Sequence, residues 1–377
     1  MKTRLLALQI ITPLLAILFG AFIASVIIFA IGKNPLDVYA IMARFALTRQ
    51  DSLISILFKA TPLIFAGLAV AISFRANLWN IGVEGQYYIG AFCAAYVGFT
   101  FHGLPAIVHL PLTVLAAVLG GMAWAYVPII LKLKRGAHEV ITTIMMNYIA
   151  GAVVLYLVAD VFRDPSQIGT PRVRTPEFLP SARMPTLEPL VRALGVEGAD
   201  ISKLNWLLPL GLLLCVALAL LLSRTRFGYE VRAVAFNPDA AEAAGIPNAR
   251  TQFLMFMLSG AIAGLVGLND VQGFFGYFDI DFPKGLGFLG ISVALLSKNN
   301  PLGVILAALL FGFLDRGAQG VQFFAEVPKE VIVILQALII LAIVVAYELL
   351  NRYIRAQRKR EAQRPVPTAA PAAEPGR

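Results

Sequence analysis

Residues 53–73 read LISILFKATPLIFAGLAVAIS, a predominantly apolar run of roughly 20 residues. A helix rises 1.5 Å per residue, so a run of this length crosses the ~30 Å hydrocarbon core of a bilayer. Similar runs recur along the 377-residue chain, which is 59% hydrophobic and only 14% charged. Soluble domains usually carry about 25% charged residues. The sequence therefore predicts an all-α, polytopic bundle of transmembrane helices rather than a soluble core.

The apolar runs on either side bring the expected total to about ten spans, within a transmembrane domain of residues 1–350. The first follows Lys2 and Arg4 and is expected to be retained, because it is too long for a signal peptide and lacks a clear cleavage site. The eighth is short, so it either crosses fully or forms a half-helix paired with its successor. The expected spans are 6–31, 53–73, 82–101, 105–131, 140–160, 205–222, 252–271, 286–297, 301–315 and 331–350.

The net charge of +9 does not indicate nucleic-acid binding, because the basic residues lie in short loops between apolar runs and in the C-terminal tail. This distribution follows the positive-inside rule and places both termini in the cytoplasm. An even number of spans, split after the fifth, gives two halves of inverted topology, a common build for transporters. The inverted repeat rests on this parity alone.

Two segments outside the spans are rich in proline. Residues 161–204 are expected to form a long irregular extracytoplasmic loop, which is either a docking surface or disordered. Residues 351–377 form a basic tail rich in proline and alanine, and the composition predicts disorder on the cytoplasmic side.

Residues 74–86, FRANLWNIGVEGQ, place several polar side chains where the third span begins. A carboxylate at the bilayer centre costs about 2.5–3.5 kcal/mol on insertion scales, so Glu84 is expected to face a cavity or a partner. Asn80 can cap the following helix and leave backbone N–H groups aimed into a polar cavity. Two interpretations stay open for this stretch: lining of a pathway, or capping at the membrane interface.

The loop 223–251 contains NPDAAEAAG at 237–245, which has the pattern of a complete short helix. Asn237 is placed to cap it, Pro238 occupies the first helical position, and Gly245 ends it. Two turns alone are marginal in water. We therefore expect this helix to pack either in a groove on another protein or on the chain's own loops.

Cysteine, histidine and nucleotide-binding patterns give no catalytic or metal site. Cys93 and Cys215 lie inside apolar segments, and His138-Glu139 lacks the second histidine of a zincin helix. No G-x-x-x-x-G-K-[ST] phosphate loop is present, so this chain does not cradle ATP in that way. Energy for any transport is expected to come from a partner or an ion gradient.

Three segments resemble the membrane permease subunits of ABC importers: NIGVEGQ at 80–86, EVITTIMMN at 139–147, and the loop 225–246. The branch they resemble comprises the nucleoside and simple-sugar permeases, relatives of the ribose and branched-chain amino acid permeases, and the resemblance covers residues 5–350. It implies a bacterial inner-membrane importer without a cofactor on this chain. ATP hydrolysis then lies on two cytoplasmic ATPase subunits, and a binding lipoprotein delivers substrate from outside.

The resemblance also implies that a second, related but non-identical permease chain completes the path, and that the short helix at 237–245 is a coupling helix inserted into the ATPase. Small residues such as Gly260 and Gly264 permit close helix approach, either to that second chain or within this one. The expected ATPase-coupling residues are Arg226, Gly228, Arg232, Asn237, Ala240, Ala241, Glu242 and Gly245.

Polar side chains inside apolar runs predict a substrate path, since such groups are costly unless they face a cavity or pair. For Asn147 and Asn269, interhelical hydrogen bonding remains the alternative, worth under ~2 kcal/mol. The expected path residues are Trp79, Asn80, Glu84, Gln86, Asn147, Asn269, Asp270 and Gln272.

The resemblance of NIGVEGQ to the nucleoside branch implies that the substrate is a nucleoside or a related small polar solute. The neutral amides of the expected path and the aromatic faces of Phe74 and Trp79 agree with this. A simple sugar remains the alternative, since the same amides serve hydroxyl groups. A second class of function, an ion-coupled secondary transporter, would require ionisable residues inside the spans, for which Glu84, Glu139 and Asp270 are the candidates. An intramembrane enzyme has no matching constellation of residues.

Overall fold

The computed structural model describes residues 18–48, 50–193, 195, 199–325 and single residues between 331 and 352. The chain divides into two compact units, one formed by Ile28–Val333 and the other by Met1–Ile27 with Ile334–Arg377. The larger unit, Ile28–Val333, contains the helices from α2 to α14. The first part of the expected span 6–31, nearly all of the span 331–350 and the tail lie outside the described residues.

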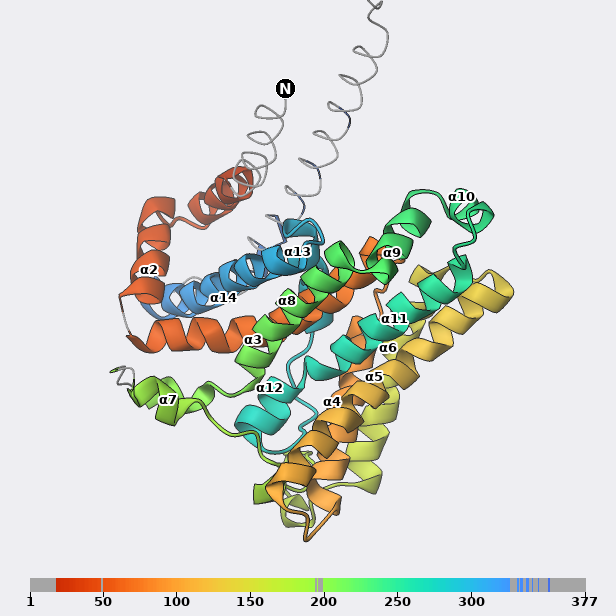
Figure 1. The fold of residues 1–377 in the computed structure, drawn as a ribbon. Helices are drawn as coiled ribbons and strands as arrows, with labels where there is room; N and C mark the ends of the chain where they lie inside the picture. The colour runs from red at the N-terminus through yellow and green to blue at the C-terminus, as the bar shows by residue number, and fades with distance from the viewer. Residues whose placement is uncertain are drawn as a thin grey trace, which may run out of the picture. The chain divides into compact units, whose positions relative to one another are not determined.

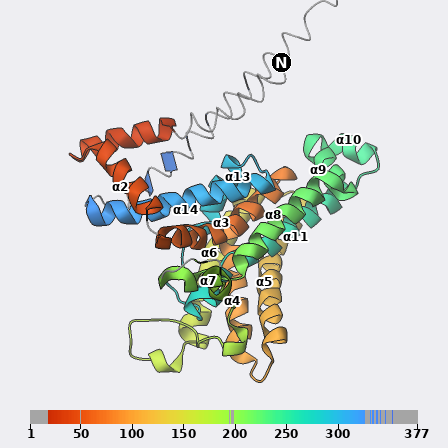
Figure 2. The same cartoon turned by 60° about the vertical axis from the view of Figure 1, so that its left-hand side comes forward.

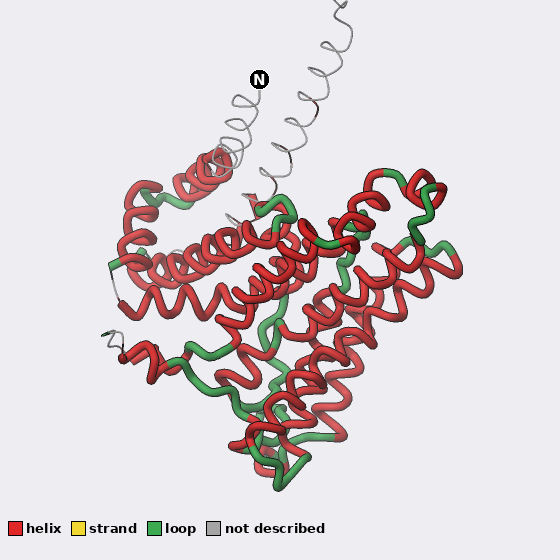
Figure 3. The backbone as a smooth tube through the Cα atoms, in the orientation of Figure 1, coloured by secondary structure: helices red, strands yellow, loops and turns green. Residues whose placement is uncertain are grey.

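Helices build the larger unit, and its described residues contain no β-strand (Figure 3). The long helices are α2 (Pro35–Leu47), α3 (Gln50–Arg75), α4 (Val83–Thr100), α5 (Ala106–Arg135), α6 (Glu139–Tyr156), α8 (Leu207–Arg224), α9 (Arg226–Phe236), α11 (Asn248–Leu265), α13 (Leu286–Leu296) and α14 (Pro301–Phe324) (Figure 1). The short elements are η1 (Leu157–Val161), η2 (Pro165–Gln167), η3 (Pro180–Ala182), α7 (Glu188–Ala193), η4 (Ala199–Lys203), α10 (Pro238–Ala243), α12 (Leu268–Asp270) and η5 (Val271–Phe275).

Six described helices are long and apolar enough to cross a membrane, or seven if the bent pair Leu18–Ala30 and Pro35–Leu47 is one span. The six are Asp51–Arg75, Ala106–Arg135, Glu139–Val161, Leu207–Arg224, Asn248–Phe275 and Pro301–Phe324. The chain is therefore a multi-pass membrane protein, and the predicted all-α bundle is confirmed. The expected third span forms α4, which has 18 residues but more polar ones, and the eighth forms α13, which has only 11.

Two of the long helices, α2 and α9, were not expected, and α9 lies in the predicted loop 223–251. Residues 35–47, between the first two predicted spans, form α2. Its start follows ordinary capping rules, because the Asn34 side chain accepts a 3.1 Å hydrogen bond from the Leu36 N–H and Pro35 occupies the first helical position.

The ninth predicted span, 301–315, is shorter than the helix that the structure shows. In the structure α14 continues to Phe324. The Arg316 guanidinium lies 4.6 Å from the centre of the Phe45 ring and donates a 2.9 Å hydrogen bond to Gln319. These contacts accommodate the charge inside the helix and let it extend.

Glycines bring α4, α5 and α11 into backbone contact, and the three helices lie side by side (Figures 1 and 2). A Cβ at Gly90 would lie 2.6 Å from Gly264 Cα, and one at Gly264 would overlap the Ala117 carbonyl oxygen. On the next turn, a Cβ at Gly121 would overlap the Gly260 carbonyl oxygen. The small residues of α11 thus serve packing within the chain, one of the two uses that the sequence allowed.

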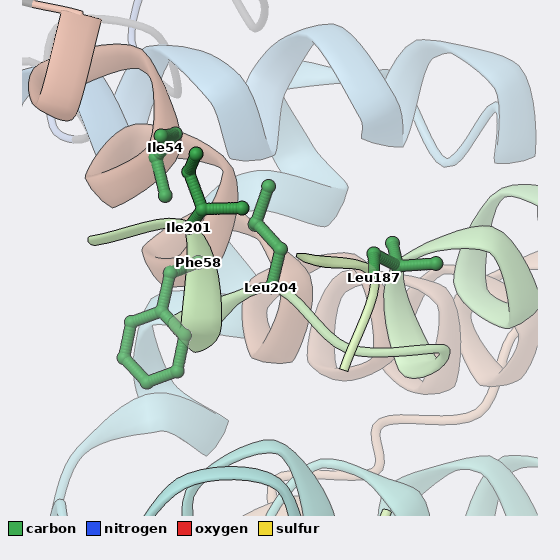
Figure 4. Packing of buried hydrophobic residues seen from close by; sticks show 5 residues of the cluster. All are labelled: Ile54, Phe58, Leu187, Ile201 and Leu204. Carbon is green, nitrogen blue, oxygen red and sulfur yellow. The ribbon is translucent and has the colours of Figure 1, made fainter. Parts of the chain in front are cut away.

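The expected irregular loop 161–204 contains short helices and folds back onto α3. The Leu187 N–H donates a 2.7 Å hydrogen bond to the Leu204 carbonyl, which closes the segment between them. Apolar side chains from both ends of this segment then pack against the first half of α3 (Figure 4). The buried cluster consists of Ile54, Phe58, Leu187, Ile201 and Leu204.

We predict that Gly264→Ala lowers the thermal stability of the purified protein, because the new methyl group meets the α5 backbone. Overpacking of this kind costs about 1–3 kcal/mol, which exceeds the gain of about 1 kcal/mol from replacing glycine in a helix. Gly151→Ala in α6 is the matched control, since a Cβ there meets nothing within 4 Å. Thermal unfolding in detergent should show a lower midpoint for Gly264→Ala only, and equal midpoints would contradict this packing.

Candidate functional site

A cavity of about 450 Å³ lies between α4, α6 and the segment that joins η5 to α13. Its wall combines aromatic rings with a few polar groups. Among the described residues, no group of three His, Cys, Asp or Glu side chains is placed to hold a metal ion. The lining residues are Glu84, Tyr88, Ile144, Asn147, Tyr148, Gly151, Ala152, Val154, Leu155, Phe278, Ile280, Asp281, Lys284 and Phe288.

Glu84 lies in the first turn of α4, and its carboxylate is fixed by backbone groups from α13. Oε1 accepts a 2.6 Å hydrogen bond from the Gly285 N–H, and Oε2 accepts a 2.9 Å bond from the Gly287 N–H. Both N–H groups lie at the start of α13, where no intrahelical acceptor exists. The expectation that Glu84 faces a cavity or a partner is met on both counts.

An aromatic cluster joins α4 to the segment before α13. The Tyr87 hydroxyl lies 3.0 Å from Glu84 Oε1 and 2.8 Å from the Pro283 carbonyl oxygen. Its single proton can be donated to either oxygen. The rings of Tyr87 and Tyr88 are 5.0 Å apart, and Tyr88 packs edge-on against Phe278 at 6.5 Å. These separations are typical of favourable aromatic pairs. The Tyr88 ring also lines the cavity.

Asn147 of α6 fixes the start of α4 and also lines the cavity. Its Oδ1 accepts a 2.8 Å bond from the Gly85 N–H, and its Nδ2 donates a 2.9 Å bond to the Ile81 carbonyl. The interhelical role and the cavity-lining role proposed from sequence therefore coexist at this residue.

Asn80 and Gln86 are almost fully buried and outside the cavity wall. Their amides exchange hydrogen bonds of 2.9 and 3.0 Å, and Asn80 Nδ2 also donates to the Ser259 hydroxyl at 2.8 Å. The residue at the N-cap of α4 is Gly82, and Asn80 Oδ1 accepts its N–H at 3.1 Å. The expected N-cap, Asn80, therefore lies two residues before the observed one. The path role of the Asn80–Gln86 amide pair stays a prediction.

The expected cluster at 269–272 lies apart from the cavity, where α11 gives way to η5. Asn269 accepts a 3.1 Å hydrogen bond from Asn205, and Gln272 donates a 2.6 Å bond to Thr113. Asp270 follows Asn269 in the chain and is also buried, and its carboxylate interacts electrostatically with Lys59. The Gln272 Oε1 is buried without a hydrogen-bond partner. A path role for these residues also stays a prediction.

Trp79 lies at a second, wider cavity of about 790 Å³, which is lined by the α5–α6 turn and the start of α11. Its ring packs against Phe74 in a tilted pair with centroids 4.8 Å apart, and the Trp79 side chain stays half exposed. In the same cavity, Lys132 Nζ and Glu139 Oε2 form an ion pair at 2.7 Å.

The short helix expected at 237–245 is present as α10. The Asn237 side chain accepts 3.1 Å hydrogen bonds from the N–H groups of Asp239 and Ala240, and Gly245 has a left-handed φ of +82°. The N-cap and C-terminal glycine are thus confirmed, as is Pro238 at the first helical position.

The loop around α10 presents an uneven surface. Ala241 is buried at 4% exposure, whereas Ala240 is exposed and the neighbouring Phe236 is 94% exposed. Further back, Arg232 donates a hydrogen bond to the Leu222 carbonyl, which ties α9 to α8. Gly228 permits the tight turn, since a Cβ there would overlap the carbonyls at the end of α8. Of the remaining residues predicted for this surface, Arg226 and Glu242 are exposed.

The loop that follows η1 lies beside the first turn of α5, at the end of this helix that is away from α10. His109, in the first turn of α5, contacts the Ser181 hydroxyl at 2.9 Å, whereas the last turn of α5 borders the 790 Å³ cavity. Figures 1 and 2 both place α10 at the end opposite this loop. Within the loop, burial would raise the pKa of Asp164, yet hydrogen bonds from Ser166 and the charge of Arg174 outweigh it and hold that pKa below its usual range.

Sequence reasoning missed most of the aromatic wall. Tyr88 could have been found, because it lies one helical turn after Glu84 and shares its face of α4. Phe278 and Phe288 come from a segment about 200 residues away, and no local pattern connects them with Glu84.

Comparison with known proteins identifies relatives over most of the chain. Residues 52–344 match the family described as the branched-chain amino acid transport system permease component. The guanosine ABC transporter permease protein NupP of Bacillus subtilis is 35% identical over 354 residues, 94% of this chain and 97% of the relative.

Two further relatives cover the chain to a similar extent. The glucose ABC transporter permease protein TsgB13 of Haloferax volcanii is 35% identical over 91% of this chain and 88% of its own. The nucleoside ABC transporter permease protein NupB of Lactococcus lactis is 33% identical over 92% of each. The family match and these identities agree with the multi-pass helical architecture, and the chain belongs to the family of branched-chain amino acid transport system permease components.

Proposed function

We propose that this chain is the membrane permease subunit of an ATP-driven ABC importer for nucleosides or sugars, with ATP hydrolysis on separate subunits. The observation that carries the proposal is the near full-length similarity to permeases named for guanosine, nucleosides and glucose. The six helices able to cross a membrane support it, as does the cavity beside one of them, α6, which is lined by both aromatic and polar groups.

Within that class we propose that the solute is a nucleoside and that the 450 Å³ cavity is part of its path. Phe288 and Tyr148 line the cavity and are half or more exposed, so their faces are available to stack on a base. Asn147 and Glu84 line the same cavity, where the remaining lone pairs of Asn147 Oδ1 and Glu84 Oε2 can accept hydrogen bonds from hydroxyls or base edges. The other predicted path residues, Trp79, Asn80, Gln86, Asn269, Asp270 and Gln272, would contribute in other conformations of the transport cycle.

Phe288→Ala should reduce nucleoside uptake about tenfold, because stacking of a base on an aromatic ring contributes about 1–3 kcal/mol. Phe288→Tyr is the matched control and should retain uptake, since it keeps the ring. The measurement is ATP-dependent uptake of radiolabelled nucleosides, with pentoses and hexoses as competitors, in vesicles that contain the complete transporter and its binding protein. If sugars are carried and nucleosides neither enter nor compete, the substrate is a sugar and this assignment is wrong.

We further propose that α10 is the coupling helix and that it binds the cytoplasmic ATPase. Its exposed surface includes Ala240 and Glu242 and borders the exposed ring of Phe236. A small, partly apolar surface of this kind suits insertion into a groove on a partner. Arg226, Gly228 and Arg232 would support the helix from α9, since the last two fix the turn from α8.

Ala240→Arg should abolish co-purification of the ATPase, because a long charged side chain replaces a methyl group at the centre of the proposed contact. Ala240 is a better position than the buried Ala241, where a large side chain would disturb the loop itself. Ala193→Arg is the matched control: it introduces the same side chain at an exposed position of the short helix α7. If both variants retain the ATPase equally, α10 is not the docking element.

The remaining architecture follows from the same proposal. The chain would cross a bacterial inner membrane about ten times as two inverted halves, with both termini and the α10 end in the cytoplasm. The loop 161–204 would face outward, toward a substrate-binding lipoprotein. A second permease chain, related but not identical, would complete the path.

A further inference from the structure

Residues 276–285 form a ten-residue segment that we call the strap. It lies between η5 and α13, and each end carries a glycine in the left-handed region, Gly276 at φ +74° and Gly285 at φ +88°. Other residues adopt these angles only with strain, so the two glycines set sharp changes of direction at its ends. The strap is therefore bounded by two backbone positions suited to act as hinges.

A carboxylate from a different helix holds the α13 end of the strap. Glu84 accepts hydrogen bonds from the N–H groups of Gly285 and Gly287, and Tyr87 shares its hydroxyl with Pro283 of the strap. A Cβ at Gly287 would lie 2.5 Å from the Glu84 backbone nitrogen, so only glycine permits this approach. We call these contacts the latch.

The other side of the strap is bonded to the loop that follows η1. The Thr175 N–H donates to the Phe278 carbonyl at 2.9 Å, and the Phe278 N–H donates back to Thr175 Oγ1 at 3.0 Å. Arg174 and Asp279 form an antiparallel bridge between the two segments. The Arg174 guanidinium also lies 4.3 Å from the centre of the Tyr277 ring. Loop residues 173–178 and the strap are thus tied into one ribbon.

The strap is also one wall of the 450 Å³ cavity, to which it contributes Phe278, Ile280, Asp281 and Lys284. We propose that the strap is a movable wall of this cavity, that the Glu84 latch holds it closed, and that loop 173–178 moves with it. Displacement of the loop would draw the strap from Glu84 and open the cavity. This inference rests on the proposed function, because it assigns the opening to a transport cycle.

The latch is tested by the accessibility of a cysteine behind the strap. Val154 lines the cavity and is 2% exposed, so Val154→Cys, with Cys93 and Cys215 replaced by alanine, reports opening to a water-soluble thiol reagent. Glu84→Gln replaces one acceptor oxygen by an NH2 group that faces an N–H. The labelling rate should rise roughly tenfold, as expected for loss of a charge-assisted hydrogen bond.

Asp281→Asn is the matched control, because it removes the same charge from the same cavity without touching the latch. It should label at the parent rate. Equal labelling rates for the two variants would overturn the latch. It would also be overturned if Glu84→Gln labels faster only because the midpoint of its thermal unfolding has collapsed. This assay needs no transport, so it stands apart from the proposed function.

The link between loop and strap is tested by a disulfide. Cα atoms paired across an antiparallel bridge lie about 4.5–5.5 Å apart, within the range that a disulfide spans. Arg174→Cys with Asp279→Cys should therefore cross-link on oxidation, and the oxidised and reduced forms should take up solute at the same rate because the two segments move together. If oxidation stops uptake and reduction restores it, the strap moves apart from the loop and the proposal is wrong. The protein without these two cysteines is the control under both conditions; if it carries neither nucleosides nor sugars, the proposed function fails instead.

Discussion

The carboxylate of Glu84 determines how two distant parts of this chain meet. It lies at the start of α4 and satisfies N–H groups at the start of α13, 201 and 203 residues further along the chain. The first N–H groups of a helix have no partner of their own, and inside a membrane protein water is not freely available to supply one. This contact fixes the end of the strap against α4 at one side of the cavity, whereas α13 itself packs mainly on α3.

The same need to satisfy buried polar groups explains where the other amides lie. Asn147 bonds to backbone groups before and within α4, and Asn80 pairs with Gln86 and Ser259. A buried amide without partners costs several kcal/mol, so these side chains are occupied by the fold itself. In the conformation described, the cavity wall consists of aromatic and aliphatic side chains together with four polar residues, of which Glu84 and Asn147 also bond to the backbone.

Local sequence patterns were sufficient for most of the long helices and for α10, but they missed α2 and α9, and contacts between distant segments were not predictable. Apolar length gave most of the spans, and the order Asn237, Pro238, Gly245 gave α10. The end of α14 was misplaced because the partners of Arg316 lie partly in another helix. Likewise, Asn80 looked available to a solute because nothing near it in sequence indicates Ser259, 179 residues away.

The order of elements along the chain connects α10 to the wall of the cavity without a break. α10 leads into α11, which continues through α12 and η5 into the strap. At Gly260 and Gly264 the backbone of α11 packs directly against α5, with no side chain in between that could change rotamer. A large shift of α11 would therefore either move α5 with it or break this contact. Because η5 is a π-helical turn, the register of the chain changes just before Gly276, where the strap begins. If α10 is the coupling helix, as proposed, its displacement would be passed through these elements to the wall of the cavity, where the strap meets the carboxylate of Glu84.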